Sequence, residues 1–201
     1  MGDVCMFKKD YEKAKQYLKM MTPINFSTEL LSPLCEENIN KRVQQHKYNA
    51  LTLIYNLHDQ IHRVTFDDVT LTNKDRYEIN LNLLNFYKNI FGSDKVGNMS
   101  FYFYELYGNL ASYATLLNLD ISIIIAYLNN AKEVARYYDN DFKNEHIFEG
   151  HLFKNIKSVK GDFCAFGGKS LCEVFKEYHL KGDVYDSIRQ TKQFKDFINN
   201  L

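Results

Sequence analysis

Residues 101–138 read FYFYELYGNLASYATLLNLDISIIIAYLNNAKEVARYY, and this stretch decides the fold. Its apolar side chains recur at intervals of three and four, which predicts two helices joined by a short turn at residues 118–120. Both helices are apolar on more than one side. We therefore expect this central pair to lie in the middle of a stack of helices.

The composition of the 201-residue chain favours helices and gives no electrostatic pull toward polyanions. The chain has 25 basic and 25 acidic residues, so no global field attracts nucleic acid or an anionic membrane surface. It has only two prolines and nine glycines, fewer turn residues than a strand-rich fold usually needs. A chain of this length can bury a core unaided.

We expect neither a secretory signal peptide nor disulfide-paired cysteines in this chain. No basic and apolar leader opens the chain, and no apolar window is long enough for a membrane span. The four cysteines lack CxxC spacing and are expected to be reduced thiols: Cys5, Cys35, Cys164 and Cys172. These features predict a cytoplasmic protein without a membrane partner.

Helices are also predicted on the N-terminal side of the central pair. Asp10 is an expected N-cap for a helix ending near Met21, and a helical turn follows at Ser27–Leu31. From Leu34 to Val64 there is neither Gly nor Pro, which predicts one long helix or two nearly collinear ones. Its expected apolar stripe is Ile39, Val43, Ala50, Leu53, Ile54, Leu57, Ile61 and Val64. Thr72, with Asp75 three residues later, is an expected N-cap for a helix ending at Phe91.

The C-terminal third is predicted to be helical with one aromatic loop. Asn144–Asn155 is expected to be a helix with Ile147, His151 and Leu152 facing inward. Ser158–Lys169 is expected to be a loop held by Phe163 and Phe166. Short helices are predicted at Ser170–His179 and Thr191–Leu201, and no strand is predicted anywhere. Helix pairs recur at roughly thirty to forty residues, which is typical of a helical solenoid.

Two segments resemble tetratricopeptide repeats. Gly2 and Ala14 are twelve residues apart, like the small residues at which the two helices of such a repeat cross. In the central pair, Leu110-Ala111, Asn118, Tyr127-Leu128 and Ala131 resemble a second, degenerate repeat. The implied fold class is all-α, a tetratricopeptide-like solenoid of antiparallel helix pairs.

The order of sequence words along the chain resembles a more specific family. The words are Asp10–Met21, Ser27–Leu31, Gly97–Tyr102, the central pair, Val184–Arg189 and Phe194-Lys195. Their series resembles the C-terminal helical domain of clostridial-type cro/repressor-like helix-turn-helix transcriptional regulators.

This resemblance implies a sensor domain that regulates a separate DNA-binding segment. We expect residues 1–201 to form a single helical-repeat domain, with residues 158–201 as its C-terminal loop and capping helices. The DNA-binding helix-turn-helix of the family would lie outside this chain, which is then expected to be a fragment or a truncated family member. DNA would be reached only through that absent segment.

The candidate ligand-binding residues are Tyr102, Tyr104, Tyr107 and Asn109, on the first central helix. First helices line the concave face of tetratricopeptide arrays, where Tyr and Asn can bond a ligand backbone and offer apolar area. The alternative is that these aromatic side chains pack between helices. Solvent exposure separates the two interpretations.

No catalytic, metal or cofactor motif is predicted. His58 and His62 are four residues apart without a HExxH pattern, and we expect them to be a surface pair. Residues 161–169, GDFCAFGGK, have the wrong glycine spacing for a phosphate-binding loop. No nucleophile is paired with a base, so the protein is not expected to be an enzyme.

The expected function is a non-enzymatic sensor that binds a peptide or protein effector in a helical groove. Self-association into a homodimer is a further expectation, since helical arrays are also used in that way. The alternative is a stand-alone scaffold or adaptor with no link to DNA.

Overall fold

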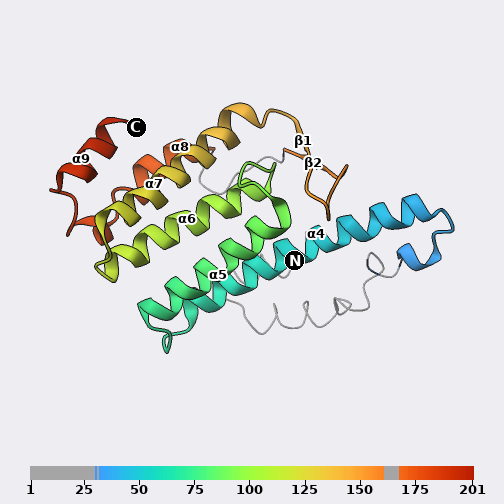
Figure 1. Cartoon of the computed structure of the whole chain (residues 1–201), viewed down its shortest axis with the longest axis horizontal. Coiled ribbons are helices and arrows are strands. Elements are labelled where there is room, and N and C mark those ends of the chain that lie inside the picture. The colour runs from blue at the N-terminus through green and yellow to red at the C-terminus, as the bar shows by residue number, and fades with distance from the viewer. Residues whose placement is uncertain (1–29, 31, 161–167) are drawn as a thin grey trace. The chain divides into compact units, whose positions relative to one another are not determined.

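The computed structural model describes residue 30, residues 32–160 and residues 168–201 (Figure 1). The predictions for Asp10–Met21, for most of Ser27–Leu31, for the Gly2 and Ala14 pair and for Phe163 and Phe166 lie outside the described residues. The chain divides into two compact units, residues 1–52 and residues 53–201. The boundary falls within helix α4.

In the first unit, a 3₁₀ turn, η2 (Ser32–Cys35), precedes the start of α4 (Ile39–Asp67). Asn38 caps this helix, because its Oδ1 accepts hydrogen bonds from the backbone amides of Asn40 at 3.0 Å and Lys41 at 3.2 Å. Of the two predicted alternatives, one long helix is confirmed. It begins at Ile39 rather than Leu34 and ends at Asp67 rather than Val64.

In the second unit, the buried face of α4 differs from the predicted apolar stripe. Ile54, His58 and Thr65 are buried, whereas Leu53, Leu57 and Val64 of the stripe are exposed. The prediction was wrong for those three positions because α4 packs here through aromatic and polar side chains. It was also wrong for Ile39 and Val43 in the first unit, which are exposed. The rings of Tyr55 and Tyr102 stack at 5.4 Å between centroids.

Helix α5 (Asn73–Phe91) begins and ends as predicted. Thr72 Oγ1 accepts from the Asp75 amide at 3.2 Å, and the Asp75 carboxylate accepts from the Thr72 amide at 2.9 Å. This reciprocal capping satisfies two amides of the first turn. At the other end, Gly92 adopts the left-handed conformation with φ 72°, which glycine reaches without steric cost.

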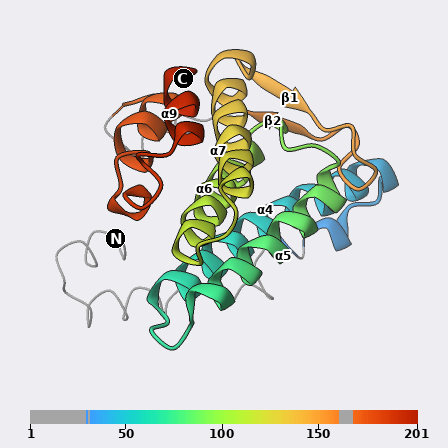
Figure 2. The same cartoon turned by 60° about the vertical axis from the view of Figure 1, so that its left-hand side comes forward.

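The central pair is confirmed as helices α6 (Met99–Leu116) and α7 (Ile121–Arg136). They are joined by a turn in which Asn118 has φ 53°, and Asp120 caps α7 by accepting from the Ser122 amide at 2.8 Å. Helix α6 contacts α5 on one side and α7 on the other. The three helices run in alternate directions (Figure 1; α6 and α7 also in Figure 2).

Residues 145–159 form a β-hairpin, which the sequence did not predict. Strand β1 (Glu145–Ile147) pairs antiparallel with β2 (Lys157–Val159). The helix predicted at Asn144–Asn155 is therefore wrong, and the three residues expected to face inward are exposed, namely Ile147, His151 and Leu152. The hairpin is held instead by Phe148 and Phe153, whose rings lie 5.7 and 5.3 Å from that of Phe91.

The C-terminal part consists of short elements packed on the central pair. A π-turn, η3 (Tyr137–Asp141), extends α7. Helix α8 (Leu171–Val174) continues into a second π-turn, η4 (Phe175–His179), which confirms the predicted helix there. A 3₁₀ turn, η5 (Asp183–Tyr185), leads to α9 (Lys192–Asn199), which is capped by Thr191. Helices α8 and α9 both contact α7.

The described residues are thus mostly helical, with six α-helices and one two-stranded sheet. The all-α prediction holds apart from this hairpin. None of the helices in the described ranges combines the length and the apolar character needed to cross a membrane.

Candidate ligand-binding site

A pocket of about 300 Å³ lies between α6 and the C-terminal helical segment. Five of its lining residues come from α6, and three come from α8 and η4. They are Phe101, Tyr104, Glu105, Gly108, Asn109, Val174, Tyr178 and His179. All belong to the second unit, and α6 is among the best-buried helices of that unit.

The four predicted ligand-binding residues do not come together in this pocket. Tyr104 and Asn109 line it, but Tyr104 is only 6 % exposed. Tyr107 is buried and donates from its hydroxyl to Asp94 at 2.9 Å. Tyr102 faces α4, with its ring centroid 4.3 Å from that of His58. Burial favours the packing interpretation for Tyr104 and Tyr107, whereas half-buried Asn109 is accessible from the pocket.

Glu105 is the only acidic residue in the pocket lining. Its side chain is 28 % exposed, and its Oε2 lies 3.4 Å from Nε2 of His58. His58 is buried, with Nδ1 3.1 Å from the hydroxyl oxygen of Tyr87. The carboxylate of Glu105 therefore lies between the pocket and a histidine that is itself fixed by a tyrosine.

The position of His58 corrects the expected surface pair. His58 and His62 do lie on one face of α4, with ring centroids 6.3 Å apart. His58 nevertheless points into the protein because α5 and α6 offer it Tyr87 and Tyr102 as ring partners. In the described parts of the chain, no three side chains of the His, Cys, Asp or Glu type are grouped so that they could hold a metal ion.

His179 forms the opposite wall of the pocket and is held by a chain of polar contacts. Its Nε2 lies 2.8 Å from the Tyr185 hydroxyl, which lies 3.1 Å from Oγ of Ser112 on α6. Its ring stacks on Phe175 with centroids 5.6 Å apart. Burial lowers the pKa of His179 to about 4, so the imidazole is neutral at pH 7.

Asn109 contributes a hydrogen-bond acceptor to the pocket. Its Nδ2 donates to Oδ1 of Asn80 at 3.3 Å, and Asn80 donates in turn to the backbone oxygen of Arg76 at 2.7 Å. The amide orientation of Asn109 is thereby fixed, and its Oδ1 remains as an acceptor for a ligand.

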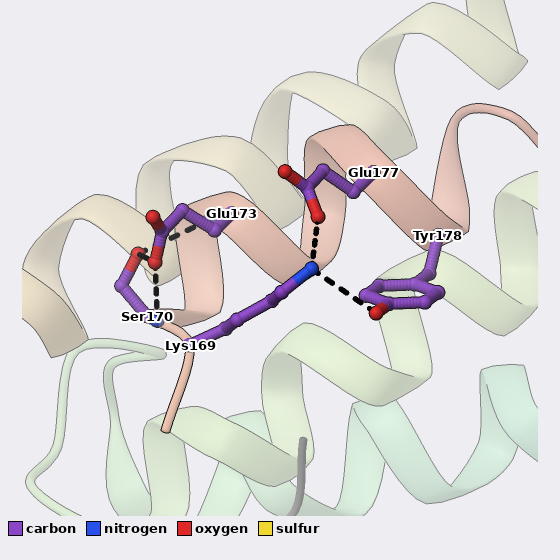
Figure 3. A network of polar contacts seen from close by, with 5 residues as sticks. All are labelled: Lys169, Ser170, Glu173, Glu177 and Tyr178. Carbon is purple, nitrogen blue, oxygen red and sulfur yellow. Dashed lines mark hydrogen bonds and ion pairs between the residues drawn. The ribbon is translucent and has the colours of Figure 1, made fainter. Parts of the chain in front are cut away.

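The rim of the pocket includes Tyr178, which is tied to the start of α8 (Figure 3). Nζ of Lys169 donates to the Tyr178 hydroxyl at 3.1 Å and forms an ion pair with Glu177. Next to it, Ser170 and Glu173 form a capping box. The charge of Lys169 is thus compensated outside the pocket lining. The four-residue α8 and the engagement of Lys169 give no support to a phosphate-binding loop; residues 161–167 lie outside the described part.

Comparison of the chain with protein-family models, with curated proteins and with solved structures finds no match. The resemblance to helix-turn-helix regulators therefore stays a prediction, and the chemistry of the site rests on its own geometry.

Six of the eight lining residues were not predicted, namely Phe101, Glu105, Gly108, Val174, Tyr178 and His179. Glu105 and Asn109 are four apart on one helix, a spacing that places both on one face. Gly108 in the middle of a helical pattern was a signal for close approach of another group. His179 could not be found from the local sequence because it contacts Gly108, which lies 71 residues earlier in the chain.

Proposed function

We propose that this chain is a non-enzymatic peptide-binding module of tetratricopeptide-like design, and that it serves as the sensor domain of a transcriptional regulator. The packing of α5, α6 and α7 in alternate directions supports a helical-repeat design. The regulatory role comes from the resemblance in the sequence. The ligand class comes from the pocket on α6.

The observation that carries the proposal is the charge of the pocket. Glu105 is its one charged lining residue at pH 7, since burial keeps His179 neutral. Asn109 offers an acceptor oxygen, and half-buried Phe101 and exposed Tyr178 offer aromatic surface. A carboxylate next to aromatic rings is the chemistry that recognises a cation. The pocket therefore binds a lysine or arginine side chain of a peptide.

The contacts behind Glu105 keep its carboxylate in place. Nδ1 of His58 lies 3.1 Å from the Tyr87 hydroxyl, and its Nε2 lies 3.4 Å from Oε2 of Glu105, so His58 contacts both groups. A pre-positioned carboxylate loses less side-chain freedom when a ligand binds, which increases affinity. His58 and Tyr87 are thus positioning residues for the binding group.

In the proposed sensor, the bound peptide stabilises one arrangement of the C-terminal segment relative to α6. The pocket joins these two elements, so a ligand that contacts both favours the state in which they are together. A ligand shifts such an equilibrium only by its difference in affinity for the two states.

The test is calorimetric titration with two short peptides of otherwise identical sequence. The basic peptide has lysine and arginine at positions where the other peptide has glutamine. We expect binding of the basic peptide and a loss of about tenfold or more in affinity for Glu105→Gln. The matched control is Glu149→Gln, an exposed glutamate outside the pocket. Equal affinity for both peptides, or an equal effect of both variants, contradicts the proposal.

The scaffold alternative predicts a different partner. A stand-alone adaptor would bind a folded protein without needing Glu105, and its gene would have no in-frame helix-turn-helix segment. Light scattering of the purified chain reports the expected homodimer independently of the peptide.

A further inference from the structure

A second concave surface, which we name the C-terminal groove, lies between the end of η4, residues 189–190 and α9 (red in Figure 2). Its volume is about 690 Å³, more than twice that of the pocket on α6. Leu180, Phe194, Ile198 and Leu201 provide its apolar lining. Phe194 and Leu180 are buried parts of the core, whereas Ile198 is 37 % exposed and offers apolar surface to a ligand.

The charged side chains that line the C-terminal groove have a single sign. Its lining contains four basic side chains and no acidic one. The four are Lys176, Lys181, Arg189 and Lys195. The three lysines are exposed, and none of them forms an ion pair with a residue in the described ranges. In a chain with no net charge, this concentration of cations is a local feature.

Arg189 plays a different part from the lysines. Its Nη1 and Nη2 donate to the backbone oxygens of Leu180 at 3.2 Å and Gly182 at 3.1 Å, and Nε donates to Asp186 at 3.0 Å. The guanidinium thus fixes the wall of the groove. Lys176, Lys181 and Lys195 remain to contact a ligand.

We propose that the C-terminal groove binds an acidic peptide segment that places one large apolar side chain against Ile198. The apolar lining supplies the burial that favours binding, and the lysine rim pairs with aspartate or glutamate residues that flank this apolar side chain. The charge preference is opposite to that of the pocket on α6. The two sites therefore select different segments of a partner, or different partners.

The experiment uses the full chain and a fluorescein-labelled peptide of leucine and phenylalanine flanked by aspartates and glutamates, followed by anisotropy. We expect saturable binding that weakens as salt is raised, because the lysines are exposed to solvent. The double variant Lys181→Glu/Lys195→Glu is expected to lose about tenfold or more in affinity. Lys192→Glu is the matched control, since Lys192 is an exposed residue of the same helix that does not line the groove.

A second variant covers the case in which charge reversal disturbs folding. Ile198→Ser removes apolar contact without changing charge, and it is expected to weaken binding several-fold while circular dichroism stays unchanged. Glu105→Gln is expected to leave acidic-peptide binding intact. A negative result for the pocket on α6 can therefore be distinguished from a negative result for the C-terminal groove. Any of three results overturns the proposal. They are no saturable binding, an equal loss of affinity with Lys192→Glu, and tighter binding of dodecanoate, an anionic alkyl chain, than of the peptide.

Discussion

Gly108 of α6 lies directly against the imidazole of His179, so that a Cβ on Gly108 would be 2.8 Å from Cε1 of His179. This close approach joins the central helix to the C-terminal segment. It also brings together the two walls of the pocket on α6.

The Gly108→Ala variant is expected to be destabilised. Alanine is favoured over glycine in a helix by about 1 kcal/mol, but the added methyl group overpacks a fixed ring at a cost of about 1–3 kcal/mol. The ring cannot move freely because Tyr185 and Phe175 hold it. Urea denaturation measures the change in the free energy of unfolding. In a His179→Ala background, the same substitution should be neutral or stabilising, and an unchanged cost there would contradict this explanation.

Stability is expected to fall in mild acid because His179 is buried in its neutral form. Its pKa is lowered from about 6.5 in an unfolded chain to about 4, so the unfolded state binds more protons between these two values. Stability contributed by the neutral imidazole is complete above pH 6.5 and is lost as the pH falls toward 4. A shift of this size corresponds to a loss of up to about 3 kcal/mol across this window.

Comparison with His179→Gln isolates this contribution. Burial also lowers the pKa of His146, and carboxylates titrate in the same range, so the wild-type slope has several sources. The difference between the wild-type and variant unfolding curves should shrink as the pH falls from 6.5 to 4. His151→Gln, at an exposed histidine, should leave the slope unchanged.

The Tyr87→Phe variant is expected to weaken both the fold and the binding site. Loss of the hydroxyl leaves Nδ1 of buried His58 without its partner, which costs about 1–3 kcal/mol. His58 then holds Glu105 less firmly, so affinity for the basic peptide should also fall. Tyr113→Phe is the control, because its hydroxyl makes no hydrogen bond with a described residue. Unchanged peptide affinity in Tyr87→Phe would show that Tyr87 and His58 do not position Glu105 for binding.

The parts of the fold that were predictable are those fixed by local chemistry. Thr72 and Asp75 set the start of α5, and Gly92 sets its end, through contacts within a few residues. The central pair has apolar side chains on several faces, so its interior position followed from periodicity alone.

The hairpin and the site depend on contacts between distant segments. Strands of three residues are too short to show alternation, and Phe148 and Phe153 are buried because Phe91 lies against them. In the same way, the phase of α4 was decided by Tyr87 and Tyr102 rather than by its own apolar residues. A pocket between α6 and η4 could be located only once the chain had folded back.

The thiol of Cys172 is expected to react slowly with alkylating reagents. Burial, followed by a hydrogen bond to Asp139, raises the pKa of Cys172 to about 12. Asp139 also accepts from the backbone amides of Leu171 at 3.0 Å and Cys172 at 2.8 Å, which holds the start of α8. Because only the thiolate attacks, iodoacetamide at pH 8 should modify exposed Cys35 well before Cys172.

Peptide mapping by mass spectrometry resolves the rates at the two cysteines. Asp139→Asn removes the carboxylate that favours the protonated thiol and weakens the attachment of α8, so it should accelerate modification of Cys172 specifically. Asp141→Asn, at an exposed position in the same π-turn, should change neither rate. Equal rates for Cys35 and Cys172 in the wild type would show that α8 opens readily from η3, because a thiol held in the packed state cannot form the thiolate that the reagent requires.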